Sequence, residues 1–299
     1  MKAETKTSPQ AMGPADPRRV EQLQTKHGLT YHVPYAFEAE SSVGLRGKRV
    51  LEVGGSLPPA FVLDDLDVAQ WVAIEEMEYW EGLPEGPAGT RPKTTPCRRL
   101  GEVHGSALPA RYEILNGGVE DLPHALEGKF DIVFSIAAFE HLLRMPVALD
   151  RMFAALRPGG RLFTMFSPIW SSHNGHHLPR LVDKAGKTFG FGQSPIPPWG
   201  HLLMRPAQLM KYLSECTDAA TAAQMVHFVF HAQHINRLFT EDFAEFFVAS
   251  RFHVDTLIPT FTVEMPPEIQ ANLMRLFPGR THFSNNGLMA VLSKPDGGS

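Results

Sequence analysis

The sequence predicts an α/β protein built on a doubly wound, mostly parallel sheet. Short apolar segments alternate with helical segments through the first half of the chain, as they do where helices cover both faces of a parallel sheet. Two of these segments end in an acidic residue, and the first runs directly into Gly54-Gly55. A strand that ends in this way opens a nucleotide-binding unit at the carboxyl edge of the sheet.

Five strands are expected before residue 168, because each segment is a short apolar run bounded by turn residues. They are Val50–Val53, Trp71–Ile74, Tyr112–Leu115, Phe130–Ser135 and Arg161–Phe166. Two helices are expected between these strands. The first covers Phe61–Leu66, and Pro58-Pro59 delay its start; the second covers Val147–Leu156 and is stopped by Pro158-Gly159-Gly160. Glu81–Pro96 is expected to be a loop.

The pattern changes after Ser167, where proline, histidine and aromatic residues replace clean periodicity. Helices are expected at Pro206–Cys216 and Ala219–Phe239. A further helix begins near Thr240, with acids in its first turn, and runs to about Ser250. Two late strands, His253–Leu257 and Gly287–Ser293, are expected to complete the sheet.

Composition excludes several classes of partner. The 299 residues carry a formal net charge of −4, so no basic footprint for nucleic acid is present. No apolar run reaches the roughly 18–20 residues of a membrane span. The two cysteines, Cys97 and Cys216, have no metal-type spacing and indicate a reducing compartment. We expect a soluble cytoplasmic protein with no nucleic-acid or membrane partner, and a homodimer is compatible with this composition.

Four segments together resemble the class I S-adenosylmethionine-dependent methyltransferases. The most specific is the last, in which Ser135 precedes Glu140-His141-Leu142 and then Leu156-Arg157-Pro158-Gly159-Gly160. The others are Val50-Leu51-Glu52-Val53-Gly54-Gly55, Glu75 after the second strand, and Gly118-Val119-Glu120-Asp121-Leu122-Pro123. The resemblance covers roughly residues 47–167 and, more weakly, 236–294. It implies a Rossmann-like fold and S-adenosylmethionine as cofactor.

The resemblance also implies a role for several cofactor-binding residues. Glu52 would hold the amino group of the cofactor, and Gly54 and Gly55 would let the backbone approach it. Glu75 would bind the ribose hydroxyls, and it follows Glu52 by the roughly 20 residues typical of such units. Val119 would meet the adenine ring.

Further cofactor contacts follow from the resemblance and from two positions at which this sequence differs from the usual pattern of the family. Ser135 and Ile136 would line the methyl-transfer cavity. The glycine turn has Ser56 where a third glycine is usual, so Ser56 joins the expected contacts. Gly118 replaces the usual adenine-facing aspartate, and the adenine amine is then expected to meet Glu120 or Asp121. The first turn also lacks the Gly-x-Gly-x-x-Gly pattern of a nicotinamide dehydrogenase.

The expected domain organisation follows from these boundaries. Residues 1–20 form a flexible leader and residues 21–46 an N-terminal extension. Residues 47–167 form the cofactor-binding Rossmann-like core. Residues 168–239 form an inserted substrate lid rich in histidine and aromatic residues, and residues 240–299 complete the core.

Histidines are concentrated where the acceptor should lie. Eight of the 14 fall between His141 and His234. His173, His176 and His177 follow the fifth strand, and with His141 they are candidate catalytic residues. Because neutral imidazole is a general base near neutral pH, one of them could deprotonate an acceptor hydroxyl. A structural role in a polar-aromatic lid is the alternative.

A metal site is a separate hypothesis. His227, His231 and His234 have the i, i+4, i+7 spacing of one helix face, and imidazole is a common metal ligand. A divalent ion held there could chelate the oxygens of an acceptor.

Three functions remain open on the sequence. The first is O-methylation of a small-molecule, glycan or natural-product acceptor with a histidine base; the segments Ile169–His177 and Pro198–Leu203 are similar to methyltransferases of glycan and natural-product pathways. The second is a metal-dependent methyltransferase. The third is a non-catalytic S-adenosylmethionine-binding partner or regulatory protein.

Overall fold

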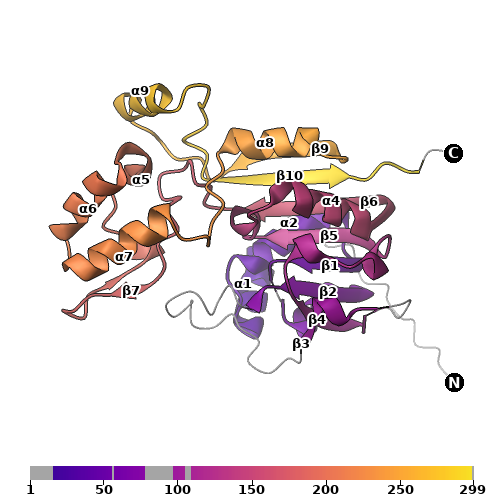
Figure 1. The fold of residues 1–299 in the computed structure, drawn as a ribbon. Helices are drawn as coiled ribbons and strands as arrows, with labels where there is room; N and C mark the ends of the chain where they lie inside the picture. Colours follow the sequence, from indigo (N-terminus) through magenta and orange to yellow (C-terminus); the bar gives the residue numbers. More distant parts are fainter. Residues whose placement is uncertain (1–15, 56, 78–96, 105–108, 298–299) are drawn as a thin grey trace, which may run out of the picture.

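The computed structural model describes residues 16–297, apart from residue 56 and residues 78–96 and 105–108. Its centre is an eight-stranded sheet with the order β3-β4-β2-β1-β5-β6-β10-β9 (Figure 1). Strand β10 is antiparallel to β6 and β9, and the other neighbours are parallel. The prediction of a doubly wound, mostly parallel α/β sheet is therefore confirmed.

The bounds of β1, β2, β4, β5 and β10 agree closely with the expected runs. Strand β6 begins at Leu156 rather than at Arg161, so that Pro158-Gly159-Gly160 lies within it, and β9 extends to Thr260 rather than to Leu257. The sequence pattern did not reveal β3. The strands are β1 Arg49–Val53, β2 Gln70–Glu75, β3 Cys97–Arg99, β4 Tyr112–Asn116, β5 Phe130–Ile136, β6 Leu156–Phe166, β9 His253–Thr260 and β10 Gly287–Ser293. Every residue of β2 and β5 is buried. Burial on both faces explains why these strands are continuous apolar runs.

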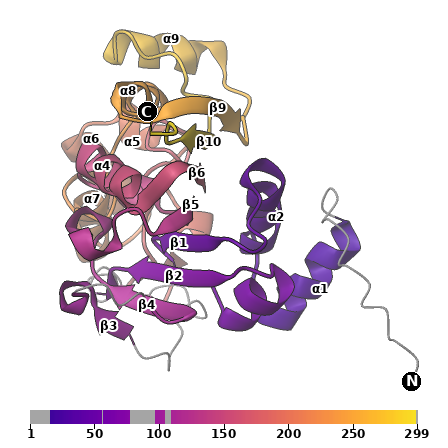
Figure 2. The same cartoon turned by 90° about the vertical axis from the view of Figure 1, so that its right-hand side faces the viewer.

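Two apolar cores cover the two faces of the sheet. One core packs α4 (Met145–Ala155) and α8 (Thr240–Ala249) against the strands. The other packs α1 (Pro17–His27), α2 (His32–Val43) and the short π-helical turn η1 (Phe61–Asp65). Figure 2 shows α1 and α2 on one side of the strands and α4 on the other.

A third apolar core forms a separate lobe beside the sheet (Figure 1). It is built from the segment between β6 and α8 and from Leu273 and Phe283. Its elements are β7 (Leu181–Val182), β8 (Thr188–Phe189), α5 (Gly200–Leu203), α6 (Pro206–Ser214), α7 (Ala219–Phe230) and α9 (Pro267–Leu276). We keep the name lid for residues 168–239, and that division of the chain stays a prediction.

The predicted helix Ala219–Phe239 is wrong in its length, because α7 ends at Phe230. The guanidinium group of Arg237 folds back and donates to the carbonyl oxygens of Phe228, Val229 and Ala232. These bonds satisfy carbonyl groups that a helix end leaves without intrahelical partners. A side chain beyond the helix thus terminates it.

The N-terminal predictions fall partly outside the described residues. Three parts of these predictions belong to the undescribed residues: residues 1–15 of the expected leader, Ser56, and the whole of the expected loop 81–96. Helix α1 begins at Pro17, inside the expected leader, and Asp16 caps it by accepting a hydrogen bond from the Arg18 amide. None of the helices that the structure describes is long and apolar enough to cross a membrane.

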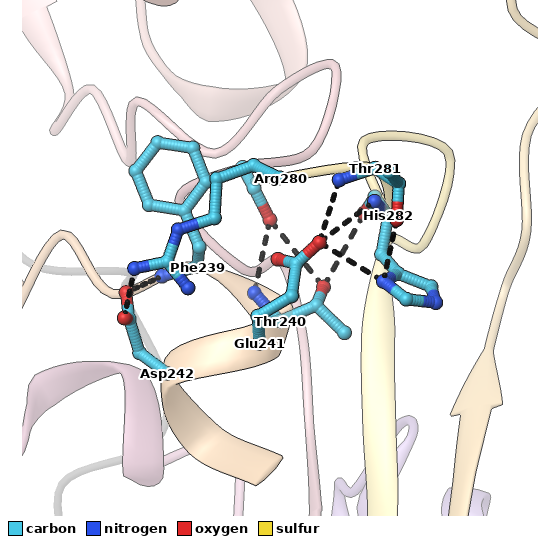
Figure 3. Close-up of polar contacts among 8 residues, drawn as sticks. Phe239, Thr240, Glu241, Asp242, Arg280, Thr281 and His282 are labelled. Carbon is cyan, nitrogen blue, oxygen red and sulfur yellow. Dashed lines mark hydrogen bonds and ion pairs between the residues drawn. The ribbon is translucent and has the colours of Figure 1, made fainter. Parts of the chain in front are cut away.

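Two acids at the start of α8 tether the chain that follows α9. Oε1 of Glu241 accepts hydrogen bonds from the backbone N–H groups of Thr281 and His282 at 2.7 and 3.0 Å, and from Nδ1 of His282 at 2.9 Å. Asp242 forms an ion pair with Arg280 (Figure 3). These contacts join the sheet domain to the chain that carries α9.

Protonation should weaken this tether. Burial alone would raise the pKa of Glu241, but the hydrogen bonds from Thr281 and His282 outweigh it and lower the pKa. A carboxyl group with a lowered folded pKa stabilises the fold above its ordinary pKa, and the effect is lost as pH falls through the folded value.

We predict that Glu241→Gln weakens the tether by about 1 kcal/mol, because neutral hydrogen bonds are weaker than charged ones. Hydrogen exchange at the Thr281 and His282 amides should accelerate roughly fivefold. Glu245→Gln, at an exposed position of the same helix, is the control. Equal exchange in both variants would contradict the role of Glu241.

Candidate active site

A cavity that is partly open to solvent lies at the carboxyl ends of the central strands. Its wall is made by the residues that end or follow β1, β2, β4 and β5. They include Val53, Gly54, Glu75, Glu76, Gly118, Val119, Glu120, Ala137, Ala138 and His141. This is the edge of a doubly wound sheet at which ligands bind.

Gly54 allows two walls of the cavity to meet closely. Its φ is +80°, and a Cβ placed there would lie 2.3 Å from Cβ of Ala138. The Gly54 amide donates a hydrogen bond to the carbonyl oxygen of Ile74 at 2.9 Å, which fixes the turn against β2. Glycine is required here by both backbone conformation and space.

Glu52 supports the glycine turn from behind and is not among the residues that line the cavity. Its Oε2 accepts hydrogen bonds from Nε1 of Trp71 at 2.6 Å and from the Leu57 amide at 3.0 Å. The carboxyl group is buried, and burial raises its pKa to about 8 against the hydrogen bonds from Trp71 and Leu57. A Cβ on Gly55 would lie 2.8 Å from Oε1 of Glu52.

The other predicted cofactor residues divide into two groups. Gly54, Glu75, Val119 and Glu120 line the cavity. Gly55, Ser135 and Ile136 are not among its lining residues, and Ser56 lies outside the described residues. The hydroxyl of Ser135 donates to the carbonyl oxygen of Val53 at 2.9 Å and ties β5 to β1.

Acidic side chains give this cavity its electrostatic character. Glu75, Glu76 and Glu120 line it, and among the lining residues that the structure describes there is no lysine or arginine. Such a wall is unsuited to a pyrophosphate and suits hydroxyl, amine and cationic groups. S-adenosylmethionine has these groups and no phosphate, so the residues present fit it.

Three lining residues were not predicted from the sequence, namely Glu76, Ala137 and Ala138. They belong to loops whose path depends on neighbouring strands.

Among the candidate catalytic histidines, His141 lines the cavity. It ends the short helical turn η5 (Phe139–His141), directly after β5. Its Nδ1 lies 2.6 Å from the carbonyl oxygen of His234, and its ring packs edge-on against His177 with centroids 5.3 Å apart. Burial lowers the pKa of His141 to about 4 and lowers the pKa of His177 well below its ordinary value, so both imidazoles are neutral at pH 7.

His173 and His176 lie in a different group of side chains. The ring of His176 packs edge-on against His201 at 5.7 Å, and its Nδ1 accepts a hydrogen bond from the Leu178 amide. His173 packs against Trp199 at 5.9 Å. Burial lowers the pKa of His176 to about 3. The structure thus brings His177, but not these two, beside His141.

The premise of the predicted metal set is wrong, because α7 does not extend through it. His227 lies on the helix, His231 is the residue that caps its end, and His234 follows it. The rings of His227 and His231 are 6.4 Å apart. Nε2 of His234 bonds the carbonyl oxygen of His177 at 3.0 Å. His234 therefore belongs to the group around His141 and His177.

Residues 97–164 match a family model described as a methyltransferase domain. No curated protein matches the sequence. Among solved structures, an S-adenosylmethionine-dependent methyltransferase from Mesorhizobium loti is 10% identical, with 87% of this chain and 97% of that chain covered and a TM-score of 0.43. A putative methyltransferase from Bacillus halodurans is 13% identical, with coverages of 87% and 98% and a TM-score of 0.43.

The phosphoethanolamine N-methyltransferase 2 of Haemonchus contortus is 11% identical, with coverages of 87% and 52% and a TM-score of 0.42. The family match over residues 97–164 includes β4, β5, the His141 turn and most of β6. It supports the resemblance to S-adenosylmethionine-dependent methyltransferases that the sequence shows over this part of the chain.

We predict that Gly54→Ala raises the Kd for S-adenosylmethionine at least tenfold, because the new Cβ collides with Ala138 and strains the turn. Calorimetric titration measures this change. Gly101→Ala is the control, since a Cβ there meets nothing within 4 Å. Adding Ala138→Gly to Gly54→Ala should restore part of the affinity. Unchanged binding by the single variant would contradict the close approach.

We further predict that Glu52→Gln flattens the pH dependence of stability. With a folded pKa of about 8 and an ordinary value of 4.5, Glu52 holds its proton more tightly in the folded state. Stability should therefore fall as pH rises between these values. Denaturant unfolding at pH 5 and pH 8 measures the difference, which should shrink in Glu52→Gln and persist in the control Glu38→Gln at an exposed site.

Proposed function

We propose that this protein is an S-adenosylmethionine-dependent methyltransferase, and that it transfers the methyl group to an oxygen atom of an acceptor bound between the cofactor cavity and the lid. The observation that supports this proposal most is the position of His141. Its side chain lines the acidic cavity and also contacts His177 of the lid. An acceptor that reaches the cofactor from the lid must pass this imidazole.

Cofactor binding is assigned to the cavity wall. Glu75 would hold the ribose hydroxyls, Val119 and Glu120 would meet the adenine, and Gly54 would admit the remainder of the cofactor. When bound, S-adenosylmethionine supplies an electrophilic methyl group on a sulfonium. Glu52 and Ser135 act indirectly, by fixing the glycine turn and the neighbouring strands.

His141 is the best candidate for activating the acceptor. A carbonyl oxygen only accepts hydrogen bonds, so Nδ1 of His141 must carry the proton that points to His234. Nε2 then has the lone pair, and in the general-base form of the mechanism it accepts the hydroxyl proton. General-base catalysis of this kind contributes roughly 10²–10⁴-fold to the rate.

The acceptor class is proposed from the composition of the lid, which is rich in aromatic and histidine residues. Trp170, Trp199 and His201 are themselves buried within the lid. We propose a small-molecule, glycan or natural-product acceptor and a cytoplasmic setting. A homodimer is also proposed.

We predict that His141→Asn lowers kcat by about 100-fold and changes the S-adenosylmethionine Kd less than threefold. The asparagine amide can still donate to the His234 carbonyl oxygen, but it lacks a basic nitrogen. Turnover is measured as release of the demethylated cofactor with a panel of alcohols, phenols and sugars, and with amines and thiols for comparison. His124→Asn, at an exposed site, is the control.

Two outcomes would contradict the proposal. Transfer to amines or thiols with none to hydroxyl groups would overturn the choice of oxygen. Tight cofactor binding with no transfer to any acceptor would instead support the non-catalytic alternative.

A further inference from the structure

Glu140, His141 and His177 form a compact group at the junction of sheet and lid. One potential ligand atom from each residue lies within 4.8 Å of the other two. Among the residues that the structure describes, this is the one group of three such side chains that could hold a metal ion. The first two residues follow β5, whereas His177 comes from the lid.

Hydrogen bonds determine which ring nitrogen of His141 and of His177 is protonated and which is left to bind a ligand. Nδ1 of His141 lies 2.6 Å from the carbonyl oxygen of His234, and Nδ1 of His177 lies 2.9 Å from that of Gly175. Since each Nδ1 must donate, each Nε2 carries a lone pair. Metal-ligating histidines are oriented in this way, with the other ring nitrogen bonded to a carbonyl or carboxylate.

Glu140 supplies the second, independent observation. Its side chain is only 3% exposed, yet its Oε2 has no hydrogen-bond partner among the described residues. Nε2 of His177 is likewise buried and without a partner there. Buried polar atoms are nearly always satisfied, and two such atoms in one group are a costly arrangement for a protein alone. A cation would satisfy both.

The group is also held in place before any ligand binds. The Asn236 amide donates to the carbonyl oxygen of Glu140 at 2.9 Å. Its side-chain amide donates to the carbonyl oxygens of Phe139 and Leu142 at 2.6 and 3.1 Å. The backbone of two of the three ligands is therefore fixed, and small side-chain rotations suffice to reach metal–ligand distances of about 2.0–2.2 Å.

We propose that Glu140, His141 and His177 bind a divalent transition-metal cation such as Zn²⁺. Two imidazole nitrogens and one carboxylate oxygen suit this class of ion better than Mg²⁺ or Ca²⁺, which prefer oxygen ligands. Three protein ligands leave at least one coordination position open, as in catalytic metal sites.

The role of the cation rests on the proposed function. Because His141 lines the cofactor cavity, the open position lies where the acceptor is expected. A cation there would make an acceptor hydroxyl more acidic, and the hydroxyl proton would pass to solvent water, to which the cavity is partly open. In that case His141 would act by holding the cation rather than as the general base. This set replaces the predicted set His227, His231 and His234, of which only His234 touches the group.

The test measures metal binding directly. Chelator-stripped protein is titrated with Co²⁺, whose visible absorption reports coordination, and the Zn²⁺ content of Zn²⁺-loaded protein is measured after gel filtration. We expect one equivalent per chain in the unaltered protein. Glu140→Gln and His177→Asn should each weaken binding at least tenfold.

Asparagine is chosen at residue 177 because the backbone there has φ of +44°, which asparagine tolerates better than most residues. The double variant His227→Asn/His231→Asn is the matched control and should retain the metal. Thermal unfolding of each variant shows that the fold is intact, and either of the two ligand variants alone suffices for the test.

The inference is overturned if the unaltered protein binds no stoichiometric metal, or if the ligand variants bind as tightly as the control. Calorimetric titration with S-adenosylmethionine on the same samples separates this inference from the proposed function. Cofactor binding without metal overturns only the metal site. Metal binding without cofactor binding overturns only the proposed function.

Discussion

Asn236 makes the contact on which the arrangement of this site depends. Its backbone and side chain together donate hydrogen bonds to three carbonyl oxygens of the loop after β5, those of Phe139, Glu140 and Leu142. Asn236 lies near the end of the lid, shortly before α8. One residue therefore fixes the loop that carries Glu140 and His141 against the chain that carries His234, whose Nε2 in turn lies 3.0 Å from the carbonyl oxygen of His177.

Two buried carboxyl groups, those of Glu52 and Glu140, differ in whether the protein satisfies their hydrogen-bonding capacity. Both Glu52 and Glu140 are almost fully buried, and burial raises the pKa of each to about 8. Glu52 is satisfied by the indole of Trp71 and the Leu57 amide, and its effect is structural. Glu140 keeps an oxygen without a described partner beside two neutral imidazoles. Because its carboxyl oxygen is left for a ligand, we infer that Glu140, rather than Glu52, is the functional group of the pair.

The sequence predicted the central strands well because β1, β2, β4 and β5 are buried, local apolar runs. It predicted the site less well because the site depends on contacts between distant residues. Glu52 has the position of a cofactor ligand in the motif, but a tryptophan on the neighbouring strand binds its carboxyl group. The histidine triple required a helix that Arg237 ends early. Glu140 and His177 could not be paired from the sequence, since the lid fold alone brings them together.

The charge of the cavity has a consequence for turnover. Glu75, Glu76 and Glu120 line the cavity, and under the proposed function they would face a ligand that carries a positive sulfonium before transfer and a neutral sulfur after it. The attraction between wall and cofactor is therefore stronger for the methyl donor than for the demethylated product. The neutral imidazoles of His141 and His177 add no opposing positive charge at pH 7. Under the proposed function, a cavity of this kind would bind the methyl donor in preference to the demethylated product, and would thereby favour release of the product.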